Sequence, residues 1–86
     1  MNTTEAQVTL IDCISRKGFE GWAEVTLLYN DLRPPPRGFE LSIVARVAEA
    51  LERRGLIEDT KDGPRLTPTG EAIRRRAATT RSTVGG

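Results

Sequence analysis

The fold is decided by residues 41–73, which read LSIVARVAEALERRGLIEDTKDGPRLTPTGEAI. Apolar residues recur at helical spacing as far as Leu51, and Gly55 stands where such a helix would end. Residues 56–67 then predict a short hairpin, because two brief strand-like runs flank turn residues at 61–64. The residues of this stretch that follow the hairpin are predicted to begin another helix. The second half of the chain is therefore predicted to run helix, hairpin, helix.

The helix before the hairpin is predicted to run from residue 39 or 40 to residue 54. Arg53 and Arg54 fall in its last turn, where the helix dipole favours positive charge. Beyond the hairpin, Thr67 is predicted as an N-cap with Pro68 at the first helical position. The buried face of the first of these helices is expected to contain Leu41, Val44, Val47, Ala48 and Leu51.

A helix is also predicted over residues 4–17. Thr4 and Gln7 have the spacing of a capping box, and an apolar stripe follows at three- and four-residue intervals. Gly18 is placed to end this helix in the left-handed conformation that glycine adopts at little cost. Cys13 lies near the stripe and is expected to be a packed thiol, because the chain has no histidine to activate it.

A second helix is predicted over residues 22–32, after a connection at 19–22 that could be a brief edge strand. Its apolar face is formed by Val25, Leu28, Tyr29 and Leu32. Trp22 and Tyr29 could form a stacking platform for bases. Core packing is the favoured interpretation, because a chain with four aromatic residues needs them for its core.

Residues 33–38, Arg-Pro-Pro-Pro-Arg-Gly, interrupt the helical pattern. Three consecutive prolines fix φ and remove three backbone donors, so an extended connector is expected. A proline-rich ligand for an SH3-type groove is the alternative. The connector is favoured because the segment is short and lies between two helices.

Length and composition indicate one small domain. The 86 residues can build one core, and we expect a domain over 1–78 followed by a flexible tail over 79–86. The chain has no apolar run of membrane-spanning length and no secretory signal, and its single cysteine calls for no oxidising compartment. A cytoplasmic location without membrane association is the expectation.

Charge is distributed unevenly although the net charge is only +1. Residues 1–32 hold two basic against five acidic side chains, whereas residues 33–86 hold eleven basic against seven acidic. Ten of those eleven are arginine, which suits phosphate and base-edge contacts. A soluble protein with a mildly polarised surface is an equally weighted interpretation.

The segments 50–57, ALERRGLI, and 65–72, RLTPTGEA, resemble the recognition-helix, wing and post-wing signature of MarR-type and related winged-helix regulators. The resemblance implies a mainly α fold with a small β-hairpin. It would be a winged helix-turn-helix with a three-helix core, a two-stranded wing and an extra C-terminal helix. It also implies that the helix over 39–54 enters the major groove of duplex DNA.

The resemblance implies that the exposed side of that helix contains Ser42, Ile43, Ala45, Arg46 and Glu49. Arg46 could fork onto guanine, and Ser42 could reach a phosphate or a base. Ile43 and Ala45 stand where the family usually has small polar residues, and Glu49 would face the groove. The candidate nucleic-acid contacts, including the wing and the basic segment after it, are Arg37, Ser42, Arg46, Lys61, Arg65, Arg74 and Arg75.

Two classes of function follow, and neither is enzymatic. The sequence shows no phosphate-binding loop, dinucleotide fingerprint, metal-ligand spacing or activated nucleophile, so no catalytic residue, cofactor or metal is expected. The first hypothesis is a small prokaryotic or phage transcriptional regulator that binds double-stranded DNA, as a homodimer or a monomer. The alternative is an adaptor or inhibitor, such as a phage-encoded modulator of a host complex. It would bind a protein through Ile43, Ala45, Glu49 and the proline segment 33–38.

Overall fold

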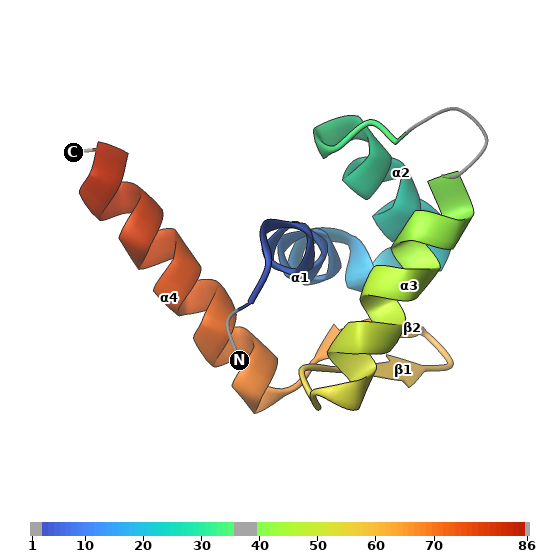
Figure 1. Cartoon of the computed structure of the whole chain (residues 1–86). Coiled ribbons are helices and arrows are strands. Elements are labelled where there is room, and N and C mark those ends of the chain that lie inside the picture. The colour runs from blue at the N-terminus through green and yellow to red at the C-terminus, as the bar shows by residue number, and fades with distance from the viewer. Residues whose placement is uncertain (1–2, 36–39, 86) are drawn as a thin grey trace.

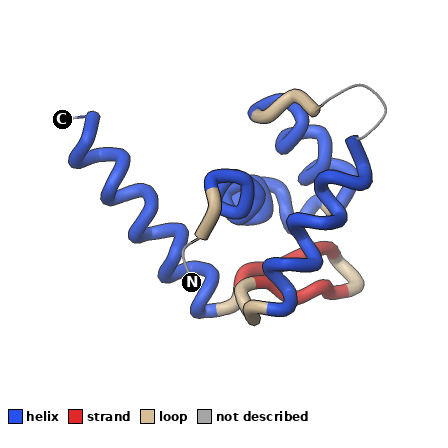
Figure 2. The backbone as a smooth tube through the Cα atoms, viewed as in Figure 1, coloured by secondary structure: helices blue, strands red, loops and turns tan. Residues whose placement is uncertain are grey.

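The computed structural model describes residues 3–35 and 40–85, with the surroundings of side chains given for 3–35 and 43–77. Helices dominate, and the two strands form one antiparallel hairpin (Figures 1 and 2). The elements in chain order are α1 (Glu5–Lys17), the 3₁₀ helix η1 (Gly18–Glu20), α2 (Trp22–Leu32), α3 (Glu40–Arg53), β1 (Ile57–Thr60), β2 (Gly63–Leu66) and α4 (Pro68–Gly85).

Helix α1 occupies the middle of the molecule. Helices α2 and α3 lie on one side of it, α4 lies on the other, and the hairpin lies across the end of this arrangement (Figure 1). The core is formed where α1, α2, α3 and the start of the hairpin meet. Its buried apolar side chains are Leu10, Ile11, Cys13, Ile14, Val25, Tyr29, Val44, Ala48, Leu51, Leu56 and Ile57.

Local cap chemistry explains where the helices begin and end. Thr4 accepts a hydrogen bond from the Gln7 amide, and the Gln7 side chain accepts one from the Thr4 amide, so the predicted capping box is confirmed. Gly55 follows α3 with φ +71°, the left-handed conformation expected of a C-terminal glycine. The bounds of α1, α2 and α3 match the prediction to within about one residue.

The start of α1 is also tied to the end of α3. Nη1 of Arg54 donates to Oε1 of Gln7 at 2.9 Å and to Oγ1 of Thr3 at 3.3 Å. The same Gln7 oxygen accepts the Thr4 amide at 3.2 Å. One amide oxygen therefore completes the helix cap and anchors a guanidinium from a residue 47 positions later in the chain.

Thr67 joins the hairpin to the two helices beside it. Its amide donates to the Leu56 carbonyl at 3.0 Å, and its hydroxyl donates to the Gly55 carbonyl at 2.6 Å. The same hydroxyl accepts the Gly70 amide at 3.2 Å, which is the predicted N-cap of α4. The hairpin register pairs Ile57 with Leu66 and Thr60 with Gly63.

The hairpin packs on the end of α1 through close backbone contact. A Cβ added to Gly18 would overlap the carbonyl oxygen of Pro64, and one added to Gly63 would overlap the carbonyl oxygen of Gly18. Gly18 has φ −54° and leads directly into η1. The left-handed stop expected at Gly18 and the edge strand considered for residues 19–22 are therefore wrong. Packing against Pro64 decides this turn.

Two other expectations differ from the structure. Leu32 was placed on the buried face of α2, but its side chain is 48% exposed because it falls in the last turn of the helix. Residues 79–85, expected as part of a flexible tail, belong to α4. Among the helices in the described ranges, none combines the length and apolar character needed to cross a bilayer.

Candidate nucleic-acid interface

The outer side of α3 is the surface on which the predicted DNA contacts were placed. Val44, Ala48 and Leu51 are buried against the core, so the helical period turns the opposite side of α3 to solvent. Arg46 is exposed, and no hydrogen bond or ion pair with another described residue engages its guanidinium. The side chains exposed along this surface, here called the outer face of α3, are Ala45, Arg46, Glu49, Glu52 and Arg53.

The predictions also included DNA contacts at Arg37 and Ser42 and an exposed side chain at Ile43. Arg37 lies outside the described residues, and Ser42 is placed on α3 by its backbone only. Ile43 was expected to be exposed, but it is half-buried and packs against the core. It also lines a small hollow together with Pro34 and Pro35, which follow α2 in the chain. The exposure expected for Ile43 is therefore wrong.

The outer face of α3 carries two arginines and two glutamates, so its charges balance. Nη2 of Arg53 lies 2.6 Å from Oε1 of Glu49, and both side chains are largely exposed. Arg46 then remains as a cation without a described partner, and Glu52 as a carboxylate without one. Neutralising phosphates needs net positive charge, which this face lacks. Among the described side chains of this face, Arg46 is the cation available to contact a base edge.

The hairpin carries the predicted wing contacts with acidic neighbours. Lys61 and Asp62 are exposed at the turn, and Glu58 and Asp59 are exposed on β1. Arg65 is half-buried, lies opposite Glu58 in the register, and donates from Nη1 to the Pro64 carbonyl at 3.0 Å. Lys61 is the more available of the two predicted cations.

The arginines of α4 lie on the opposite side of α1 from α3 (Figure 1). Nε of Arg74 donates to Oγ of Ser15 at 2.6 Å, so Arg74 joins α4 to α1. Arg75 is exposed, with Nε 3.5 Å from the carbonyl oxygen of Glu71 on its own helix. The predicted contacts therefore do not form one continuous surface: Arg46 and Lys61 lie on the α3 and hairpin side, and Arg74 and Arg75 lie on the α4 side.

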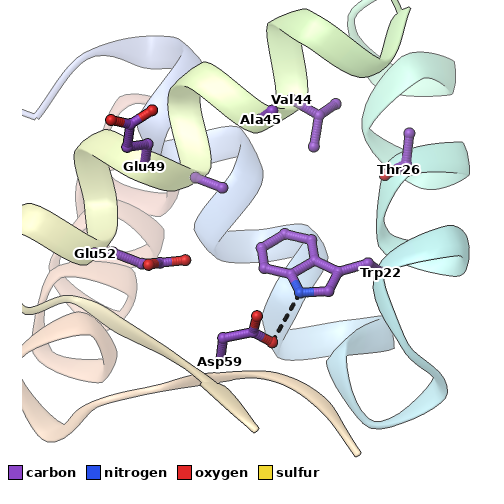
Figure 3. Close-up of a pocket in the computed structure, with 8 residues that line it drawn as sticks. Trp22, Thr26, Val44, Ala45, Glu49, Glu52 and Asp59 are labelled. Atoms are coloured by element: carbon purple, nitrogen blue, oxygen red, sulfur yellow. Dashed lines mark hydrogen bonds between the residues drawn. The ribbon is translucent and has the colours of Figure 1, made fainter. Parts of the chain in front are cut away.

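A groove between α2, α3 and β1 was not foreseen from the sequence. Its volume is about 470 Å³. Figure 3 shows the side chains that line it. Nε1 of Trp22 donates to Oδ1 of Asp59 across it at 3.0 Å, which joins α2 to the hairpin. Helical spacing gave no sign of this, because the contact spans 37 positions of sequence. The lining residues are Trp22, Thr26, Val44, Ala45, Ala48, Glu49, Glu52 and Asp59.

The only thiol is enclosed in the core. Cys13 is fully buried, and its burial, reinforced by the charge of Asp12, raises the pKa of the thiol to about 11. A thiol with this pKa is a poor nucleophile near neutral pH. Across the described ranges, no three His, Cys, Asp or Glu side chains gather as a metal site would require.

Comparison of the chain with protein-family models, with curated proteins and with solved structures finds no match. The comparisons therefore identify no family, and the resemblance to winged-helix regulators rests on the residues quoted above.

Proposed function

We propose that this protein is a winged helix-turn-helix that binds duplex DNA with the outer face of α3. Two features support the proposal. The order of three helices, an antiparallel hairpin and a further helix fits the architecture that the sequence motifs imply. The observation that carries most weight is Arg46, which is exposed on the side of α3 opposite the core and unengaged by any described residue.

In this proposal α3 enters the major groove, and the guanidinium of Arg46 donates two hydrogen bonds to the acceptor edge of a guanine. Ser42 lies one turn earlier on the same helix and Lys61 lies at the tip of the hairpin, so both are assigned to the DNA backbone. A pseudo-palindromic site would require two copies of the chain, whereas a single copy would read one half-site.

The charge of the surface sets the expected affinity. Glu49 and Glu52 share the outer face of α3 with Arg46, and Asp59 is exposed on the hairpin, so few phosphates would be neutralised. We expect binding to random duplex at low salt to be micromolar at best, since phosphate contacts supply nearly all non-specific affinity. A shallow dependence on salt follows from the small number of such contacts.

The test is a fluorescence-anisotropy titration of random duplex and of a selected high-affinity site at two salt concentrations. Arg46→Ala should weaken binding to the selected site by about 1–3 kcal/mol and change binding to random duplex little. Arg16→Ala is the matched control. It removes the same charge from an exposed arginine of α1 that pairs with Asp12. If the protein binds no duplex at low salt, the proposal is contradicted.

A second function is supported by a different observation. Ala45 is exposed beside an acid-rimmed groove, and an apolar centre with a charged rim suits a protein partner better than a phosphate backbone. In this alternative the fold serves as an adaptor or inhibitor, and the proline segment 33–38 extends the contact. Ala45→Arg should abolish capture of a stoichiometric partner while leaving the melting temperature unchanged. A stoichiometric partner captured equally by the variant would contradict this alternative.

A further inference from the structure

The groove between α2, α3 and β1 has the construction of a small-molecule site. Its volume of about 470 Å³ lies within the range of ligand pockets, which are mostly apolar with a few placed polar groups. Val44, Ala45 and Ala48 of α3 supply an apolar wall. The indole of Trp22 extends from α2 toward that wall (Figure 3).

The charged groups of this groove all have one sign. Three carboxylates line it, and no basic side chain does. Glu49 already pairs with Arg53. Glu52 and Asp59 have no cationic partner among the described residues, and their carboxylates face the indole of Trp22 (Figure 3). Two uncompensated negative charges therefore lie beside an aromatic ring.

The hydrogen bond from Trp22 holds this arrangement in place. Its Nε1 donates to Oδ1 of Asp59, which leaves Oδ2 of the same carboxylate to accept from a ligand. The indole face attracts cations through its quadrupole, and indole is the strongest of the aromatic side chains in this respect. Carboxylates reinforce that attraction, and the apolar wall favours a ligand with a hydrocarbon body.

We propose that this groove binds a small organic cation, with an amidinium, guanidinium or ammonium group on a flat apolar body. The charged group donates to Glu52 and Asp59, and the apolar body lies between Trp22 and the α3 wall. The proposal does not depend on DNA binding, because the groove is complete within a single chain and is tested without nucleic acid.

The experiment uses benzamidine as the cationic probe, with benzamide as its neutral and benzoate as its anionic counterpart. Trp22 is the only tryptophan, so selective excitation of tryptophan fluorescence reports on this groove alone. Isothermal calorimetry gives an independent dissociation constant. We expect benzamidine to bind about tenfold more tightly than benzamide, and benzoate not to bind. Equal binding of benzamidine and benzamide, or no saturable binding of benzamidine, would overturn the proposal.

Three variants locate the interaction. Glu52→Gln and Asp59→Asn should each weaken benzamidine binding about fivefold while leaving benzamide unaffected. Asp59→Asn keeps a carbonyl oxygen that can accept the Trp22 bond, so the groove is preserved. Asp62→Asn is the matched control, because it removes the same charge at the hairpin turn outside the groove. If Asp62→Asn weakens binding as much as Glu52→Gln, the effect is general electrostatic attraction and the proposed site is wrong.

Discussion

Where the hairpin meets the end of α1, main-chain atoms touch, whereas along the outer face of α3 only the ends of side chains meet. At the first place, Gly18 and Gly63 lie against backbone carbonyls and leave no room for a methyl group. At the second, an exposed ion pair joins Glu49 to Arg53, and Arg46 extends into solvent. The first contact determines where the hairpin sits. Substitutions on the outer face of α3 can change the chemistry of that surface without displacing a helix or strand.

The comparison separates residues that shape the molecule from residues that could meet a ligand. Backbone contacts are intolerant because neither side can move away without displacing a whole element. Exposed side chains reorient at little cost. Substitutions in the two regions should therefore differ in which measurement they affect: stability in the first region and binding in the second.

The largest effect is expected for Gly63→Ala. The new methyl group would overlap the Gly18 carbonyl, and φ of +117° is a conformation that alanine adopts with strain. We expect a loss of about 3 kcal/mol or more in the free energy of unfolding, measured by urea denaturation.

Gly55→Ala is the control for that variant. It shares a positive φ, +71°, but a Cβ there meets no atom within 4 Å. A loss of only about 1–2 kcal/mol is expected, from backbone strain alone. If the two variants are equally destabilised, the close contact between Gly63 and Gly18 contributes nothing of its own to the free energy of unfolding.

An intermediate effect is expected for Arg74→Ala. Its guanidinium donates to the Ser15 hydroxyl at 2.6 Å in a half-buried contact between α4 and α1. Removing it should cost about 1–2 kcal/mol, since a hydrogen bond from a charged donor exceeds a neutral one. A double-mutant cycle with Ser15→Ala measures the coupling, which would be near zero if Arg74 served only to contact phosphates.

The smallest effect is expected for Arg53→Ala on the outer face of α3. Both side chains of its ion pair with Glu49 are exposed, so the free energy of unfolding, measured by thermal melting, should fall by less than about 0.5 kcal/mol. A larger loss would show that this face is part of the scaffold. The distinction between the two regions would then fail.

Local chemistry made the helices predictable from sequence. The Thr4 and Gln7 capping box, the glycine after α3 and the Thr67 N-cap each act within a few residues, so their outcome follows from spacing. The alternation of buried and exposed positions on α3 follows from helical period in the same way, which is why Arg46 was correctly expected to be exposed.

Contacts between distant segments were not predictable in this way. Gly18 continues into η1 and lies against the Pro64 carbonyl, and Ile43 packs against the core. Arg74 was considered a phosphate contact, but its partner Ser15 lies 59 positions earlier. The groove at Trp22 requires three elements to come together before it exists. Each depends on tertiary packing that no short window of sequence contains.

The double use of the Gln7 oxygen has a consequence for the order in which the chain can mature on the ribosome. The cap of the first helix needs only Thr4 and Gln7, but its anchor, Arg54, is added 47 residues later. The opening turn therefore lacks its tertiary anchor until Arg54 has been added, and we expect its amides to gain full protection against exchange only when α3 docks. Arrested chains that stop before Arg54 should exchange the amides of this turn as quickly as an isolated peptide does.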